Sequence, residues 1–150
     1  MKIFTMNKTL IALILAAAGL LQLPAFAQGT VTGDALYKAL GEKPGITALA
    51  DDFVTRMVAD PRISPMFKNT KLPNLKEQIA DQFCLLSGGP CKYEGDTMKA
   101  AHKDLGINKA NFNQVVEHLQ FAMDARGIPF REQNKLLALL APMNRDIITK

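Results

Sequence analysis

Apolar side chains recur at intervals of three and four positions through most of this 150-residue chain, and prolines or glycines separate the stretches that show this spacing. In KPGITALADDFVTRMVAD, for example, Ile46, Leu49 and Phe53 share one face of a helix. Pro44 suits the first turn of that helix and Pro61 suits its end. No stretch alternates apolar and polar residues as a half-buried strand would. The spacing therefore predicts an all-α fold.

Other segments carry similar helical signals. The further expected helices span residues 34–41, 73–88, 96–106, 108–127 and 129–148, and residues 61–67 allow no more than one turn. Asp96 or Thr97 could cap the helix that follows them, Asn108 caps the next, and Pro142 should bend the last helix or end its regular part. Five or six helices of uneven length, joined by short loops, fit a crossing arrangement better than a regular four-helix bundle.

The segment 73–88 places two amides beside its apolar stripe. The expected inner stripe consists of Leu75, Ile79, Phe83 and Leu86. Gln78 and Gln82 are one turn apart and flank this stripe. Their amides could therefore lean over whatever the stripe covers.

The first 27 residues predict a signal peptide. Lys2 and Lys8 precede an apolar run over residues 10–23, and Ala25-Phe26-Ala27 forms a cleavage signature of small residues. The run is short for a membrane span, which needs about 20 apolar residues, and no charged flank follows it. A bilayer anchor is the alternative. We expect residues 28–150 to form one exported, most simply periplasmic, domain that is not stably inserted in a membrane.

The charge of the mature chain excludes some partners. The formal net charge of +4 falls to +2 once the two lysines of the signal peptide are removed. The chain has no dense run of lysine or arginine and no tryptophan, so it lacks the basic stripe and the aromatic platform that bind nucleic acids.

The chain has two cysteines, Cys84 and Cys91. In an oxidising compartment a pair this close in sequence could form a disulfide that closes a small loop. Free, buried thiols are the alternative. The cysteines do not show the spacing of a zinc site.

His102 is one of only two histidines, and it lies in the sequence DTMKAAHKDLG. A single histidine is more often a surface or core residue than a ligand, but the surrounding pattern is specific. Between Gly88 and Ile107 come a glycine pair, then a tyrosine and a glycine, then Met98 and His102 four positions apart, then Leu-Gly-Ile. Together with DDFVTRMVADPRISPMF and FNQVVEHL, this run resembles the group 1 truncated haemoglobins over essentially the whole mature chain.

The resemblance implies a truncated globin fold, in which two helical hairpins form a two-over-two sandwich around haem b. It implies that His102 is the proximal residue, whose imidazole nitrogen binds the haem iron. Ala100 and Ala101 are small enough for a short helix to lie close to a flat porphyrin. Because the chain has no CxxCH motif, the haem would be held without thioether bonds to such a motif.

The resemblance also implies further haem contacts. It implies that Phe67 packs on the haem face, and that Leu75 and Ile79 lie on the distal side over the iron. The residues that it implies for the cavity lining are Met98, Ile107, Phe112 and Val115. Each of these apolar residues could equally be ordinary core. Tyr93 would either reach a haem propionate or anchor its loop, and His118 is expected to be a surface or hydrogen-bonded histidine.

The chain departs from the family pattern at two polar positions. Family members that hold oxygen tightly usually have a tyrosine where this chain has Val54, and commonly a glutamine where it has Ile79. A hydrogen bond to a bound ligand contributes about 1 kcal/mol or more, so its loss should weaken oxygen binding more than carbon monoxide binding. Gln78 or Gln82 could replace the missing donors, and the sequence leaves that choice open.

These observations favour an exported haem protein that binds O2, NO or CO, or that cycles its iron between two oxidation states with an external electron donor. A haem enzyme, a nitric oxide dioxygenase or a peroxidase-like catalyst, is the first alternative. That chemistry needs a reductase, and the apolar Val54 and Ile79 make this hypothesis less favoured. A helical interaction module without a cofactor is the second alternative, and it would leave His102 without a role.

Overall fold

The computed structural model describes residues 33–150, and the expected signal peptide, residues 1–27, lies outside them. Over this range every regular element is a helix, which confirms the all-α prediction, and none is long and apolar enough to cross a membrane. In chain order the elements are α1 (Ala35–Ala39), α2 (Glu42–Ala59), η1 (Ser64–Phe67), α3 (Leu72–Leu86), α4 (Met98–Ala101), α5 (Lys109–Ala125), α6 (Phe130–Leu140), η2 (Ala141–Met143) and α7 (Asn144–Ile147).

The local signals set most of these boundaries. Thr97, rather than Asp96, caps α4, because its hydroxyl oxygen accepts a hydrogen bond of 3.2 Å from the amide of Ala100. Asn108 begins α5 in a reciprocal capping box with Asn111. The prediction of five or six helices was too low, since Pro142 divides the last expected helix into α6 and α7 through η2. A proline has no amide hydrogen to donate and clashes with the carbonyl four residues earlier.

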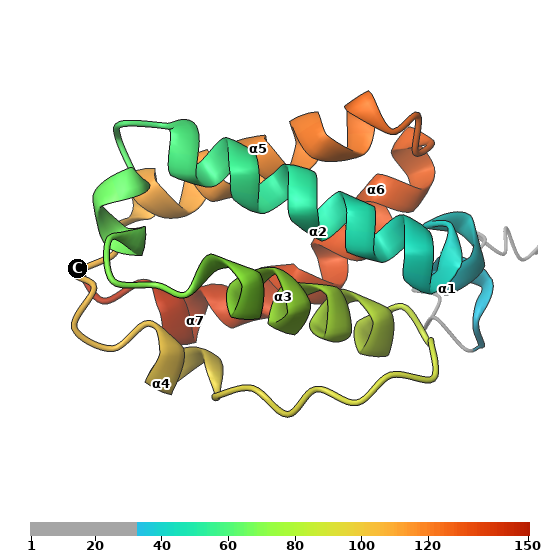
Figure 1. Ribbon diagram of the computed structural model, residues 1–150, viewed down its shortest axis with the longest axis horizontal. Coiled ribbons are helices and arrows are strands. Elements are labelled where there is room, and N and C mark those ends of the chain that lie inside the picture. Colours follow the sequence, from blue (N-terminus) through green and yellow to red (C-terminus); the bar gives the residue numbers. More distant parts are fainter. Residues whose placement is uncertain (1–32) are drawn as a thin grey trace, which may run out of the picture.

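Two antiparallel helix pairs form the fold, as the sequence predicted (Figure 1). α2 runs against α3, α5 runs against α6, and α2 also packs on α5. The core draws side chains from both pairs and from α1, and within the first pair the rings of Phe53 on α2 and Phe83 on α3 stack with their centroids 6.1 Å apart. Its fully buried large side chains include Leu36, Ile46, Leu49, Met123 and Leu136.

Helix α3 presents two different faces. Ala80, Phe83 and Cys84 are buried in the core against α2. Leu75 and Ile79 are only half-buried, as is Leu86, and they lie roughly a third of a turn away around the helix. The four residues of the predicted stripe lie within about 80° of one another around the helix, but they differ in depth. Phe83 is buried in the core, whereas Leu75, Ile79 and Leu86 are half-buried, and these three are called the second face below.

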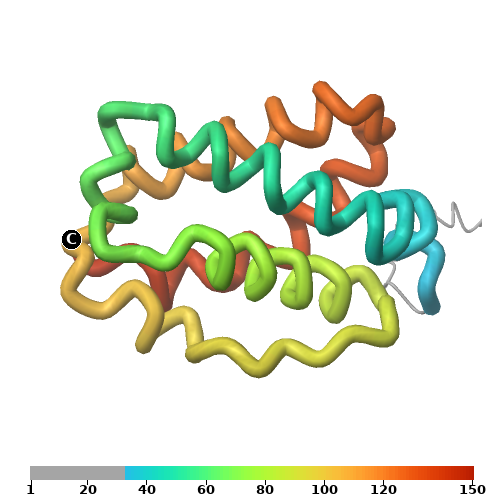
Figure 2. The backbone as a smooth tube through the Cα atoms, in the orientation of Figure 1, coloured from blue at the N-terminus to red at the C-terminus, as the bar shows by residue number. Residues whose placement is uncertain are grey.

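A long loop connects α3 to α4 and runs back along α3 (Figure 2). A disulfide between Cys84 and Cys91, with Cα atoms 5.8 Å apart, joins the end of α3 to this loop and confirms the pairing that the sequence left open. Gly89 lies inside the closed loop, and a Cβ there would be 2.6 Å from the sulfur of Cys84. Only glycine fits so close an approach.

Asp60 ties the end of α2 to α5. Its carboxylate accepts hydrogen bonds from the backbone amide and the guanidinium of Arg62, and Nε2 of His118 lies 2.8 Å from its Oδ2. The hydrogen bonds from Arg62 hold the pKa of Asp60 well below its usual range. His118 is thus the hydrogen-bonded histidine that the sequence predicted.

We expect Asp60→Asn to make the stability less dependent on pH on the acid side. The folded pKa of Asp60 is lowered, so its contribution is present above the unfolded pKa of about 4 and is lost as the pH falls through the folded value. Urea unfolding should show the free energy of unfolding falling less between about pH 6 and pH 3 in the variant than in the parent protein. Asp146→Asn, at an exposed site, is the control, and equal slopes in all three proteins would contradict the assignment.

Candidate functional site

His102 lies directly after the single turn of α4. Its Nδ1 is 2.7 Å from the carbonyl oxygen of Met98, which also accepts a 3.1 Å hydrogen bond from the backbone amide of His102. A carbonyl oxygen can only accept, so Nδ1 carries the proton and the neutral ring keeps its lone pair on Nε2. The half-buried imidazole is therefore oriented and set in the tautomer that a metal-binding histidine uses.

The chain is also held where it leaves His102. Asp104 and Gly106 both have positive φ angles, 65° and 62°, and reverse the chain direction after α4. The carbonyl of Ile107 then accepts hydrogen bonds of 2.8 Å and 3.1 Å from the backbone amides of Thr149 and Lys150. α4 packs beside α7 as well, so the C-terminal segment fixes the far end of the His102 segment.

The expected site residues, apart from Ile107, are half-buried, whereas the core residues are buried. On α5, Leu119 and Met123 are buried in the core, whereas Phe112 and Val115, nearer its start, are half-buried. The other half-buried site residues are Phe67, Leu75, Gln78, Ile79, Gln82, Tyr93, Met98 and His102, and Ile107 is buried. Apart from Ile107, these residues are thus less deeply buried than the core, although some of them pack against it.

The structure brings some of these residues together directly. Phe67, Leu75, Ile79 and Val115 pack against the edge of the core cluster. Met98 reaches α3, since Nε2 of Gln82 lies 3.5 Å from its sulfur. Ile107 and Phe112 lie outside the core cluster, where the chain passes from α4 to α5.

The two glutamines of α3 have different surroundings. Gln82 donates to the sulfur of Met98 and, at 3.9 Å, to that of Met143. The amide oxygen of Gln78 is buried and has no hydrogen-bond partner within the described residues, and a Cβ at Gly95 would lie 2.5 Å from it. An unpaired buried carbonyl costs about 1–3 kcal/mol. Gln78 therefore retains an unsatisfied acceptor beside the loop, whereas the amide nitrogen of Gln82 already faces two thioethers.

Tyr93 anchors the loop that Gln78 touches. Its hydroxyl donates a 2.8 Å hydrogen bond to the carbonyl oxygen of Asp96, which is the second of the two roles considered for it from the sequence. Burial raises the pKa of Tyr93, so the phenol stays protonated and able to donate. The bond fixes the chain just before the Thr97 cap of α4.

The surroundings of Val54 and Met143 could not be predicted from sequence patterns. Val54, which replaces the tyrosine usual in family members that hold oxygen tightly, is fully buried in the core cluster. Met143 follows Pro142 in η2 and brings its sulfur to Gln82. The sequence assigned Met143 only to an apolar helix face, because the turn that redirects it depends on how α6 packs. Gln114 on α5 also has a buried amide oxygen without a partner among the described residues, and no sequence signal marked it.

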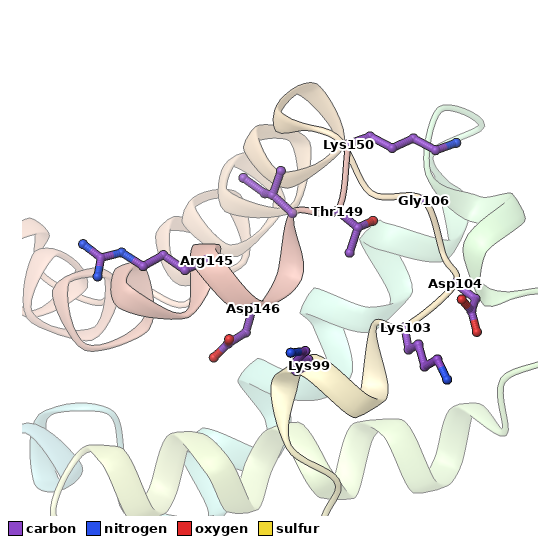
Figure 3. A pocket seen from close by; sticks show the side chains of 9 residues that line it. Lys99, Lys103, Asp104, Gly106, Arg145, Asp146, Thr149 and Lys150 are labelled. Atoms are coloured by element: carbon purple, nitrogen blue, oxygen red, sulfur yellow. The ribbon is translucent and has the colours of Figure 1, made fainter.

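A surface hollow lies close to the His102 segment. It has a volume of about 470 Å³ and lies between α4 and α7, and most of the residues that line it are charged, including Lys99, Lys103, Arg145 and Asp146 (Figure 3). His102 is not among its lining residues. The hollow is therefore separate from the largely apolar face that α3 presents.

The sequence and the fold of this chain are similar to those of known proteins. Residues 35–149 match the sequence profile of the bacterial-like globins. The chain is 31% identical over 114 residues to the group 1 truncated hemoglobin GlbN of Mycolicibacterium paratuberculosis, which covers 76% of this chain and 84% of that protein. It is similar to the crystal structure of truncated hemoglobin from Tetrahymena pyriformis in its Fe(III) form, with a TM-score of 0.73, 27% identity, and coverage of 77% of this chain and 98% of that one.

The 2/2 hemoglobin of Synechococcus, crystallised in the cyanomet state with covalently attached heme, has the same fold as this chain. The TM-score is 0.71 at 22% identity, over 77% of this chain and 98% of that one.

Proposed function

The chain belongs to the bacterial-like globin family, and from that premise we propose that it holds haem b through His102 and binds a diatomic gas on the side of the haem that faces α3. The observation that carries this proposal is the hydrogen bond of 2.7 Å between Nδ1 of His102 and the carbonyl of Met98. It leaves Nε2 as a neutral nitrogen donor in a fixed orientation.

The available donors suit a haem better than a bare metal ion. Within residues 33–150 no group of three or more His, Cys, Asp or Glu side chains gathers as a protein-only metal site would need. His102 therefore offers a single protein ligand. A porphyrin brings four ring nitrogens of its own, so one histidine is enough to complete its attachment to the chain.

The rest of the site supports the same cofactor. The half-buried apolar side chains Leu75, Ile79 and Phe112 would cover the flat faces of a porphyrin and exclude water from it. When bound, haem supplies an iron atom that coordinates O2, NO or CO. The chain's own part is to orient Nε2 of His102 and to set the polarity of the opposite side. Electrons for any change in oxidation state would come from an external donor.

We further propose that the side facing α3 stabilises polarised ligands only weakly. Ile79 is half-buried on the second face of α3, and Val54 on α2 is fully buried in the core. Neither side chain can donate a hydrogen bond. A donor there would have to come from Gln78 or Gln82, whose amides contact the loop and the thioethers.

Replacing His102 tests the proposed iron ligand. We expect the parent protein reconstituted with hemin to show the Soret band of a histidine-ligated haem b in its ferric, ferrous and ferrous-CO forms, and His102→Ala to lose or shift it, because no ring nitrogen remains to bind the iron. Absorption spectra measure this. The other histidine provides the control: His118→Gln should leave the spectra unchanged. Identical spectra for the parent protein and His102→Ala would reject His102 as the ligand.

Adding a donor to α3 tests the polarity of the ligand side. We expect Ile79→Gln to slow O2 dissociation by about tenfold or more and CO dissociation much less, since a hydrogen bond to a partly charged ligand contributes about 1.5–3 kcal/mol. Stopped-flow ligand replacement gives both rates, and Ile79→Leu controls for side-chain volume. Equal changes in the two rates would show that the substitution altered access to the site and not its polarity.

We also propose that the mature chain is exported, most simply to the periplasm. The lysines, apolar run and small residues of positions 1–27 support this. A second support is the Cys84–Cys91 disulfide, because such bonds persist in oxidising compartments and are rare in the cytosol.

Export predicts a specific mature N-terminus. Expressed as the full chain in a bacterium, the protein should be recovered from the periplasmic fraction beginning at Gln28, as N-terminal sequencing would show. Ala25→Lys with Ala27→Lys should block cleavage, because signal peptidase requires small residues there. A full-length parent chain retained in the cytosol would contradict the proposal.

A further inference from the structure

The Cys84–Cys91 disulfide is a direct covalent cross-link between helix α3 and the loop that leads to α4. Cys84 lies in the last turns of α3, which presents Gln78 and Ile79 on its second face. Cys91 lies near the start of the loop that leads to α4 and His102. The bond thus joins the helix on the ligand side to the chain that carries the proposed iron ligand.

Little else holds this loop in place. From Pro90 to Asp96 the backbone makes no hydrogen bond to other backbone groups of the described chain. Apart from Cys91, which packs against the core, the contacts of this segment with α3 include Gly95 beside the unpaired oxygen of Gln78, and Met98, just after the segment, has a 3.5 Å contact with Gln82. A segment with so few supports is expected to open locally before the helical core does.

We propose that the Cys84–Cys91 disulfide is a redox-sensitive positioning element that holds the His102 segment against α3, and that its reduction loosens this segment and the haem while the helix pairs stay folded. The haem part of this inference rests on the proposed function. The loosening of the segment does not.

The expected loss in the correct placement of His102 can be estimated from the length of chain that is free when the disulfide is absent. His102 is 11 positions after Cys91 but 13 positions after Gly89, the last residue that backbone hydrogen bonds hold to the end of α3. Without the disulfide, the free chain between the core and His102 therefore begins at Gly89. The probability of loop closure falls with the three-halves power of loop length, which makes the correct placement of His102 about 1.3-fold less favourable as a lower limit.

The bond can be reached by a reductant from one side. Cys84 is fully buried, whereas Cys91 is half-buried. A thiolate of an external dithiol would attack the sulfur of Cys91, and the sulfur of Cys84 would leave and take up a proton. The second thiol of the reductant then displaces Cys91, which also takes up a proton. Two electrons pass to the protein, and the dithiol becomes a disulfide.

Hydrogen exchange of the haem-loaded full chain tests the positioning. We compare the parent protein with Cys84→Ser/Cys91→Ser and expect exchange of the amides in residues 92–103 to be at least about 1.3-fold faster in the variant, with α2 and α5 unchanged. Dithiothreitol should cause the same change in the parent protein and none in the variant. Unchanged exchange in residues 92–103, or equal acceleration throughout the helices, would overturn the proposal.

The rate of hemin transfer to apomyoglobin tests the consequence for the haem. It should rise at least about 1.3-fold in the double serine variant, while the spectrum still shows a histidine-ligated haem. Met123→Ala, which removes a fully buried core side chain on α5, controls for general destabilisation and should not accelerate exchange selectively in residues 92–103.

The two measurements separate this inference from the proposed function. Equal hemin transfer in the parent protein and the serine variant, with His102-dependent spectra in both, overturns the inference and leaves the haem function standing. Spectra that do not depend on His102 overturn the haem function. In that case, faster exchange in residues 92–103 would still establish the disulfide as the element that holds the segment.

Discussion

Helix α3 packs against α2 on one side and lies beside the loop that leads to His102 on another (Figure 2), and much of the fold depends on this arrangement. Ala80, Phe83 and Cys84 are buried against α2, where the stacked rings of Phe53 and Phe83 form part of the core. The residues of the second face, Ile79 among them, are half-buried, so part of their apolar surface is not covered by the core. A helix that buried its apolar residues on a single face would stabilise the core equally well but would offer nothing to a cofactor.

The His102 segment is built in the opposite way, with little core of its own. α4 is one turn long and has no buried residue, so neighbouring groups must position it. The Thr97 cap, the Tyr93 hydrogen bond to Asp96 and the backbone bonds from the C-terminal segment to Ile107 all do this. The disulfide adds a covalent restraint from α3. Such a segment can accommodate a flat cofactor, but it depends on its restraints for the orientation of the imidazole.

Much of this could be predicted from the sequence where the controlling physics is local. Prolines at helix starts, the Asn108 cap and the glycines between helices set boundaries that the structure confirms. The resemblance correctly implied the globin family and its haem, and His118 has the hydrogen-bonded role expected of it. Pro142 ends the regular part of the last helix, as predicted, although the number of helices was underestimated. The prediction was incomplete where packing decides the outcome, since it did not show that only Phe83 of the α3 stripe is buried in the core.

The sequence by itself determined that this chain is helical and that His102 lies in a short helical segment, because periodicity, caps and turn residues act over a few positions. Only the tertiary structure decided that α3 has two faces, that Cys84 and Cys91 form a disulfide, and that the amide of Gln82 contacts two thioethers whereas the oxygen of Gln78 is unpaired. These features depend on which surface of a helix meets which neighbour. That is settled by contacts between segments distant in the chain, which no local pattern contains.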